Sequence, residues 1–334
     1  TEIILAAFKI WGEDCLSLFN GDWAFAIYNL ENKELLLSRD RFGVRPLYYI
    51  NNNNYFCFAS EIKSFLKIPQ FTINLNIKEI NKNLIHSGKI NKHENTWLEN
   101  VKRLEPGTNI IFSKNKILSK KKWWRTNKNI FKNDKTYNEN CENFKNILID
   151  SIKIRLPKDH DFGINVSGGL DSSSLFCLIK NLEFEKKNNL FFSKNNKNIS
   201  EQNLIEHLLN DKNDIIYNSS FTNKDIINNY EDITFTFENI NHTFDGYLWF
   251  HYKKISTQNT KIIFDGFGAD ELLGGYDECT RILAQNHFRN KNIINGLKLK
   301  KLYETISTRK KLKLDYSKIL KLILSKKNKN NSYF

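Results

Sequence analysis

The stretch FGINVSGGLDSSS, residues 162–174, decides how the second half of this chain is interpreted. Its first five residues, FGINV, have the pattern of a short buried strand, and an apolar segment with helical spacing follows it. Gly168 and Gly169 mark a turn between the two. A strand, a glycine turn and a helix start present unpaired backbone N–H groups and the positive end of a helix dipole. The stretch therefore predicts a loop that binds a phosphate chain.

Asp171 is the unusual residue of this predicted loop. Gly168 and Gly169 let the backbone approach phosphates closely, and the serine hydroxyls add donors, but an anion beside pyrophosphate is unfavourable without a cation between them. A Mg²⁺ ion shared between Asp171 and phosphate oxygens resolves this conflict. An ordinary strand-to-helix turn capped by Ser and Asp is the alternative. The sequence contains no G-x-x-x-x-G-K-[ST] motif, which disfavours a Walker-type kinase or NTPase.

A second segment repeats this plan, because KIIF at 261–264 has the pattern of a strand and DGFGADELLGGY follows at 265–276. Glycine turns bracket the carboxylate pair Asp270 and Glu271. Ligands of open α/β sheets bind at the carboxyl ends of the strands, so we expect both loops to face one crevice. Asp270 would there complete the Mg²⁺ coordination that Asp171 begins. An N-cap aspartate is the alternative interpretation.

Two patterns divide the chain into an α+β domain, residues 1–118, and an α/β domain, residues 141–334. The first is rich in short strands: a helix is expected at 2–11 and strands at 22–28, 34–38, 47–50, 55–59, 101–104 and 109–112. The second predicts an open, doubly wound parallel sheet, with strands at 162–166, 190–193, 215–217 and 262–264 and helices at 172–182, 203–209, 246–255 and from 269 onward. Residues 119–140, polar around Trp123 and Trp124, predict a linker.

The composition argues against membrane and nucleic-acid partners. The 334 residues are 40% hydrophobic, enough for a sizeable core. No run approaches the roughly 18 to 20 apolar residues of a spanning helix and no signal segment opens the chain, so we expect a cytoplasmic protein. The formal net charge is +14, yet the lysines are scattered through Asn- and Lys-rich stretches rather than gathered around an aromatic platform.

The cysteines indicate neither a disulfide framework nor a zinc ribbon, because they lie far apart and form no CxxC pair. They are Cys15, Cys57, Cys141, Cys177 and Cys279. The sequence starts at Thr1, contains no methionine and opens directly on helix-like spacing. We therefore expect the N-terminus to be cut.

The loop at 167–173 resembles SGGxDS, the pyrophosphate loop of the PP-loop ATP pyrophosphatases. Together with GADELLGGY at 268–276 it resembles the synthetase domain of asparagine synthetases. RDRFGVRPLYY at 39–49, FASEIK at 58–63 and RLEPG at 103–107 are similar to motifs of the glutaminase domain of that family. The resemblance implies an N-terminal α+β glutaminase-type domain, similar to the Ntn hydrolases, followed by a PP-loop domain.

The resemblance also implies a reaction in which ATP adenylates aspartate with release of pyrophosphate, and ammonia freed from glutamine displaces AMP. ATP and Mg²⁺ are the implied cofactors; the small-molecule substrates are ATP, aspartate or another carboxylate, and glutamine or ammonia; a homodimer is left open. The implied site comprises Ser167, Gly168, Gly169, Leu170, Ser172 and Ser173 at the pyrophosphate, Val166, Asp265 and Gly266 at the adenosine, Asp171 and Asp270 at the metal, and Phe267, Gly268 and Glu271 at the substrate pocket.

The sequence departs from the family in three places. The glutaminase nucleophile, an arginine, an NGE segment and an aspartate lie upstream of the stretch that matches Thr1. Cys15 and Cys57 are not at a chain terminus and lack the free amine that would serve as base, so we assign no glutaminase nucleophile. A downstream lysine and an ExRxPFLD stretch have no match, so we expect truncation at both ends. Phe267 stands where typical members carry the glutamate of SGEGADE.

Other activities stay open at this point. Relatives that close β-lactams or cyclise lasso peptides share the adenylation loops and differ at substrate positions. PP-loop enzymes that modify tRNA are disfavoured, because the N-terminal motifs are those of a glutaminase. A remnant that binds ATP without catalysis is the third alternative.

Overall fold

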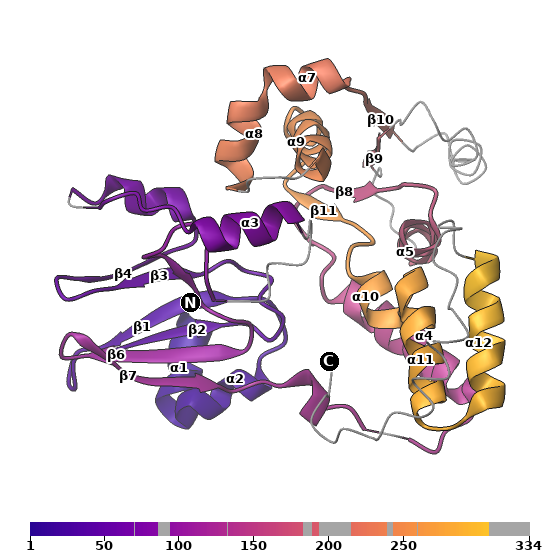
Figure 1. Cartoon of the computed structure of the whole chain (residues 1–334), viewed down its shortest axis with the longest axis horizontal. Coiled ribbons are helices and arrows are strands. Elements are labelled where there is room, and N and C mark those ends of the chain that lie inside the picture. The colour runs from indigo at the N-terminus through magenta and orange to yellow at the C-terminus, as the bar shows by residue number, and fades with distance from the viewer. Residues whose placement is uncertain are drawn as a thin grey trace. The chain divides into compact units, whose positions relative to one another are not determined.

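The computed structural model describes residues 1–69, 71–85, 94–131, 133–182, 189–193, 215–238, 243–258 and 260–306. Their contacts group into two units, and Figure 1 shows the elements of both. The first unit contains residues 1–135 and 221–250, and the second contains residues 136–220 and 251–334. Each unit is described by itself below.

The helices follow the chain as α1 (Glu2–Trp11), α2 (Cys15–Leu18), α3 (Ile77–Ile85), α4 (Tyr137–Lys153), α5 (Leu170–Asn181), α7 (Asn223–Asn228), α8 (Tyr230–Phe237), α9 (Thr243–Ser256), α10 (Ala269–Leu273), α11 (Asp277–Arg289) and α12 (Ile293–Ile306). Short 3₁₀ helices are η1 (Gly12–Asp14), η2 (Ile62–Lys67) and η3 (Thr126–Lys128). The strands are β1 (Ala24–Asn29), β2 (Glu34–Arg39), β3 (Tyr48–Asn51), β4 (Phe56–Ala59), β5 (Lys102–Arg103), β6 (Thr108–Ser113), β7 (Lys116–Lys122), β8 (Phe162–Asn165), β9 (Asn189–Ser193), β10 (Ile215–Ser219) and β11 (Ile262–Phe264).

Two antiparallel sheets form the first unit, with strand orders β1-β2-β6-β7 and β4-β3-β5. The predicted hairpins β1–β2 and β3–β4 are confirmed, with Ile27 opposite Leu36 and Tyr49 opposite Phe58. The turn of the first hairpin is closed by Asn29, whose Oδ1 accepts the N–H of Glu31 at 2.9 Å. Alternating apolar residues therefore predicted both hairpins correctly.

Strand β7 was not predicted, and it extends to Lys122, into the segment expected to be a linker. It lies at the edge of its sheet, pairs with β6, and exposes a row of lysines. Lysines on an edge strand prevent further strand addition, but in sequence they look like a solvated connection. Helix α4 was also missed, although Thr136 and Glu139 form a capping box at its start. The domain bounds drawn from sequence stay predictions.

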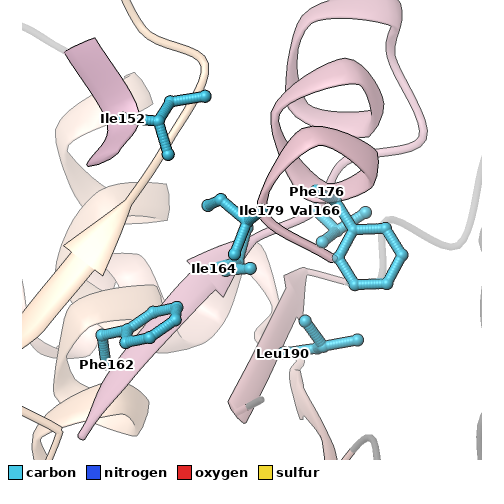
Figure 2. Packing of buried hydrophobic residues seen from close by; sticks show 7 residues of the cluster. All are labelled: Ile152, Phe162, Ile164, Val166, Phe176, Ile179 and Leu190. Atoms are coloured by element: carbon cyan, nitrogen blue, oxygen red, sulfur yellow. The ribbon is translucent and has the colours of Figure 1, made fainter. Parts of the chain in front are cut away.

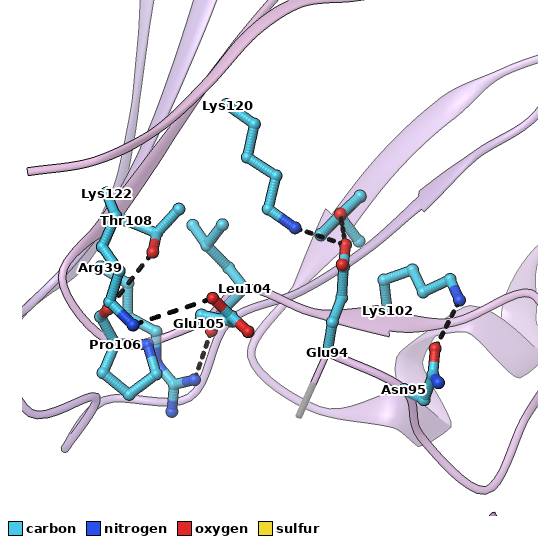
Figure 3. Close-up of polar contacts among 11 residues, drawn as sticks. Arg39, Glu94, Asn95, Lys102, Leu104, Glu105, Pro106, Thr108, Lys120 and Lys122 are labelled. Atoms are coloured by element: carbon cyan, nitrogen blue, oxygen red, sulfur yellow. Dashed lines mark hydrogen bonds and ion pairs between the residues drawn. The ribbon is translucent and has the colours of Figure 1, made fainter. Parts of the chain in front are cut away.

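The first two residues of the RDRFG motif, Arg39 and Asp40, lie in the interior of the first unit. Arg39 donates to the carbonyls of Leu104, Gly43 and Arg45, and Figure 3 shows its contact with Leu104. The Asp40 carboxylate accepts backbone N–H groups from Phe42, Val44 and Arg45, each at 3.0 Å. Both side chains are buried. These contacts give the motif a structural role in shaping the turn.

A second polar group lies nearby in the same unit (Figure 3). The Glu94 carboxylate accepts a hydrogen bond from Tyr49 and pairs with Lys120 at 2.7 Å. Burial opposes ionisation of Glu94, but these two partners outweigh it and lower the pKa of the carboxyl. Burial and Glu94 raise the pKa of Tyr49. Glu94 therefore links Tyr49 of β3 to Lys120 of the edge strand β7.

The sheet of the second unit is parallel, with strand order β10-β9-β8-β11. Gly163 of β8 is required there, because an added Cβ would lie 2.4 Å from the ring of Phe191. The buried cluster consists of Ile152, Phe162, Ile164, Val166, Phe176, Ile179 and Leu190 (Figure 2). At about 1.5–3 kcal/mol for each large side chain, its burial holds α4 and α5 to the strands. The predicted strands, α5 and α9 are confirmed, and the helix expected at 203–209 lies outside the described residues.

Candidate functional site

The two predicted loops leave the sheet at its point of strand-order reversal. From β8 the chain proceeds outward through β9 to β10, and then returns to place β11 on the other side of β8. Phe162 and Ile164 of β8 pair with Ile262 and Phe264 of β11 in parallel register. The loops that follow β8 and β11 are therefore neighbours at one edge of the sheet, where open α/β folds bind their ligands.

Ser172 holds the first loop together. Its hydroxyl accepts the N–H of Ser167 at 3.1 Å, lies 3.0 Å from the hydroxyl of Ser167, and is 3.3 Å from the carbonyl oxygen of Gly169. The hydroxyl of Ser167 also accepts the N–H of Gly169 at 3.3 Å. Gly168 has φ +80°, a backbone conformation that favours glycine. Ser167 and Ser172 therefore shape the loop through their hydroxyl groups, which are also potential donors to a ligand.

The start of α5 is open to an anion. Its N-cap residue is Gly169, and no side chain of the described residues caps the helix there. First-turn N–H groups without a capping side chain, together with the helix dipole, favour a negatively charged ligand. Leu170 is 82% exposed and Ser173 is half-buried, whereas Val166 is buried in the core. The side chain of Val166 is thus closed to a nucleotide, and its N–H already donates to the carbonyl of Phe191 at 3.0 Å.

Gly266 brings the second loop against the first. A Cβ added at Gly266 would lie 3.1 Å from Asp171 Cβ and 3.1 Å from the backbone nitrogen of Ser172. The glycine therefore permits close approach of the two backbones, as the sequence predicted for neighbouring loops. Asp171 and Gly266 are brought together, although they are far apart in the chain.

Asp265 follows β11 and is close to Phe267 and Tyr252. Its Oδ1 accepts the N–H of Phe267 at 3.0 Å, and Tyr252 lies near its carboxylate. Burial raises the pKa of the Asp265 carboxyl, and the N–H of Phe267 and the hydroxyl of Tyr252 partly offset this effect. Asn165, the last residue of β8, lies near Tyr252, and its Oδ1 is 3.0 Å from His251 Nε2. We did not predict roles for Tyr252 and Asn165, because only the folded chain brings them together.

The carboxylates of α10 face a glycine turn. A Cβ on Gly275 would lie 1.8 Å from Asp270 Oδ1, so this carboxylate lies directly over the Gly275 backbone. Glu271 accepts a hydrogen bond from the Tyr276 hydroxyl at 2.7 Å, which raises the pKa of Tyr276 to about 12. Gly268, with φ +94°, is the N-cap of α10. Asp270 and Glu271 are thus oriented by local contacts.

The carboxylates expected to hold Mg²⁺ do not form a closed protein cage. Within the described residues, no group of three or more His, Cys, Asp or Glu side chains could hold a metal ion. Mg²⁺ bound with a nucleotide commonly uses one or two carboxylates, phosphate oxygens and water. Asp171 lies in the first turn of α5, and Asp270 lies in the first turn of α10. Both assignments stay predictions.

Neither cysteine of the described N-terminal half has the properties of an activated nucleophile. Cys15 is fully buried, and burial together with Asp14 raises the pKa of its thiol. Burial also raises the pKa of Cys57. A thiol with a raised pKa is protonated near neutral pH and reacts poorly.

No helix in the described ranges combines the length and the apolar character required to cross a bilayer.

Comparison with known families gives the same assignment as the two loops. The asparagine synthase family model matches residues 143–332, more than half of the chain. The chain belongs to the asparagine synthase family. A glutamine amidotransferase domain model matches residues 1–124. The resemblance drawn from the sequence motifs is confirmed, as is the order of the two domains, whereas the PP-loop assignment stays a prediction.

The sequence identity between this member of the asparagine synthase family and the three relatives below is about one quarter. A Methanocaldococcus jannaschii protein assigned as a glutamine-hydrolysing asparagine synthetase is 26% identical over 98% of this chain and 62% of its own length. Asparagine synthetase 1 (glutamine-hydrolysing) of Bacillus subtilis is 26% identical over 89% of this chain and 46% of its own length. Amidase chry2 of Gibberella zeae is 27% identical over 54% of this chain and 26% of its own length. The chain thus spans less than two thirds of these relatives.

Proposed function

We propose that this chain provides the nucleotide-binding part of an ATP-dependent ligase that activates a carboxylate, aspartate in the first place, and forms an amide with ammonia from glutamine. The observation that carries the proposal is the close approach of Gly266 to Asp171 and Ser172. It joins a phosphate-type loop to a second glycine loop at the position where α/β sheets bind nucleotides.

In the proposed reaction, a carboxylate oxygen attacks the α-phosphorus of ATP, the bond to the bridging oxygen breaks, and pyrophosphate leaves. Ammonia then attacks the carbonyl carbon of the acyl adenylate, and AMP leaves. The backbone N–H groups of Gly168 and Leu170 and the serine hydroxyls would bind the departing pyrophosphate and stabilise its charge. Positioning supplies most of the remaining rate enhancement. Mg²⁺, held by Asp171 and Asp270, would neutralise phosphate charge.

Phe267 supports a second candidate acceptor, a bulkier or more apolar carboxylate of the kind used by β-lactam synthetases and lasso-peptide cyclases. Its ring is 63% exposed at the carboxyl end of β11, in the loop proposed to contact the substrate. A phenyl ring cannot accept a proton from ammonium, whereas a carboxylate can. It can, however, shape a pocket and exclude water.

Pyrophosphate release by the full-length protein tests both candidates. The protein is incubated with Mg²⁺, ATP and each member of a panel of carboxylates, with ammonia or glutamine as the nitrogen source. Rapid release with aspartate supports the first candidate, and Phe267→Glu should then raise the ammonia-dependent rate or leave it unchanged. Release only with bulkier acids supports the second candidate, and Phe267→Glu should then reduce it by placing a charge in an apolar pocket. ATP binding without release from any acid would indicate a non-catalytic remnant.

A further inference from the structure

A buried histidine of α9 connects the carboxyl ends of two strands of the parallel sheet. Ser219 Oγ lies 2.9 Å from His251 Nδ1, and His251 Nε2 lies 3.0 Å from Asn165 Oδ1. Asn165 is the last residue of β8, Ser219 is the last residue of β10, and β9 lies between these two strands. All three residues belong to the second unit. The imidazole therefore spans one strand, at the end of the sheet where the 167–173 loop begins.

Chemistry fixes the direction of both hydrogen bonds. An amide oxygen can only accept, so His251 Nε2 donates to Asn165, and the other ring nitrogen of a neutral imidazole accepts from Ser219. Burial lowers the pKa of His251, which favours this neutral form. The ring therefore places one acceptor and one donor between the ends of the two strands.

The same three residue types could form a nucleophilic triad, but their burial argues against that function here. In such a triad a histidine takes the proton of a serine that attacks the substrate, and a third side chain orients the histidine. Ser219 is 5% exposed and His251 is 6% exposed. A serine that is closed to solvent cannot reach a substrate, so the geometry leaves these residues a positioning role.

The three polar side chains lie beside two stacked aromatic rings. The parallel register places Asn165 next to Phe191 of β9, and Phe191 next to Tyr217 of β10. The rings of Phe191 and Tyr217 stack with 5.1 Å between their centroids. Ser219 lies two residues after Tyr217 and so points to the same face of the sheet. An apolar side chain in place of His251 would fill this layer, whereas a fully hydrogen-bonded polar group also specifies one arrangement of the elements that it joins.

Asn165 lies two residues before the loop. Val166, the one residue between Asn165 and Ser167, donates its N–H to the carbonyl of Phe191 at 3.0 Å. The chain that enters the loop is therefore held by a backbone bond to β9 and, one residue earlier, by the side-chain bond to His251. A displacement of Asn165 can be absorbed in only one residue before it reaches the loop.

We propose that His251 is a positioning residue for the 167–173 loop: it fixes the end of β8 relative to the end of β10, and thereby the point from which the loop presents its N–H groups to phosphate. This inference rests on the proposed function, because it requires the loop to bind the phosphates of ATP. His251 acts through Asn165 and is assigned no contact with the ligand. Loss of the ring should therefore weaken the binding of every ligand that carries the phosphate chain, with or without a nucleoside.

The first test is His251→Phe in the full chain, with calorimetric titrations of Mg·ATP and of Mg·tripolyphosphate near neutral pH. Phenylalanine keeps a ring but makes neither hydrogen bond. Both Kd values should rise at least about fivefold, because a small displacement at a phosphate-binding loop removes several contacts together. His251→Gln, whose amide nitrogen can donate to Asn165, should keep both Kd values within about twofold of the parent. Parent-like binding by His251→Phe, a loss for ATP alone, or equal losses in the two variants would overturn the inference.

Ile152→Val separates positioning from a general loss of stability. Ile152 belongs to the buried cluster of the same unit, so the shorter side chain should lower the free energy of unfolding and leave both Kd values unchanged. Hydrogen exchange adds a readout that needs no ligand. In His251→Phe, exchange at the amides of Val166 and Ser167 should accelerate by a larger factor than exchange at Ile164, earlier in β8. A uniform acceleration along β8 would indicate lost stability alone and would contradict the inference.

A double-mutant comparison tests whether His251 acts through Asn165. In an Asn165→Ala background, His251→Phe should cause no additional loss of tripolyphosphate affinity, whereas additive losses would contradict the proposed route. If the parent protein binds both ligands and His251→Phe binds them equally well, the inference fails and the proposed function stands. If the parent protein binds neither ligand, the proposed function fails, and the inference fails with it.

Discussion

The hydroxyl of Ser172, in the first turn of α5, accepts the backbone N–H of Ser167, five residues earlier, at 3.1 Å. The helix that is expected to receive the phosphates thus also holds the loop that precedes it. Ser172→Ala should remove this support and leave a partly buried N–H without its acceptor. We expect a loss of about 1–2 kcal/mol in the free energy of unfolding and weaker ATP binding.

Ser174→Ala is the matched control for Ser172→Ala, because Ser174 is an exposed serine two residues further along the same helix. Chemical denaturation and ATP titration of both variants check the prediction. Equal behaviour of the two variants would show that the Ser172 contacts do not shape the loop.

Gly266→Ala should separate the two loops. The added methyl group would lie 3.1 Å from both Asp171 Cβ and the Ser172 nitrogen, so one backbone must shift. We expect ATP affinity to fall at least about tenfold, because a small displacement at a phosphate loop removes several contacts together. Gly12→Ala is the control, since it meets an unfavourable φ of +56° but finds nothing within 4 Å. That control should lower stability by about 1 kcal/mol and leave ATP binding intact.

Asp171→Asn and Asp270→Asn should each weaken Mg·ATP binding or abolish ATP–pyrophosphate exchange, because each removes an anionic ligand from a hard cation. The exposed Asp159, changed to Asn, supplies a control with the same change in charge. Exchange assays and Mg·ATP titrations at several Mg²⁺ concentrations separate the metal effect from a folding effect. Unchanged affinity and exchange in both variants would place the metal elsewhere.

His251 should make the protein less stable in mild acid. Burial lowers its pKa below the ordinary value of 6.5, so the folded protein binds the proton less readily than the unfolded chain. The contribution of neutral His251 to the free energy of unfolding is therefore complete above about pH 6.5. It is lost as the pH falls from there toward the lowered pKa. Urea denaturation at pH 7.5 and at pH 5.5 should show a smaller acid loss for His251→Gln than for the parent. The exposed His160, changed to Gln, should leave the acid loss as it is.

Glu238 should stabilise the first unit by accepting hydrogen bonds from two backbone N–H groups. Its carboxylate accepts the N–H of Ile62 at 2.7 Å and that of Lys63 at 2.6 Å, and its carbonyl accepts Trp97 Nε1 at 2.9 Å. Glu238→Ala should cost about 1–3 kcal/mol and speed hydrogen exchange at these two amides. Glu231→Ala, at an exposed position of α8, should change neither. Unaltered exchange at Ile62 and Lys63 in Glu238→Ala would contradict this role.

Sequence reasoning succeeded where structure depends on neighbours along the chain. The strand, glycine turn and helix around Gly168 follow from a short pattern, and the structure places them as expected. It failed for β7, because Lys120 and Lys122 on an edge strand have the composition of a linker. The contacts of His251 with Ser219 and Asn165 could not be predicted either, since they join α9 to the ends of β10 and β8, which are far apart in the chain.

Residues 221–250 group with the first unit, although the sequence on both sides of them builds the parallel sheet of the second. No single cut of the polypeptide can therefore yield two complete halves. Expression of residues 136–334 alone would remove the amides that Glu238 binds, and residues 1–135 alone would lack the acceptor for those amides. The N-terminal half should consequently need α7 and α8 supplied, in the same chain or as a separate peptide, before it folds as it does here.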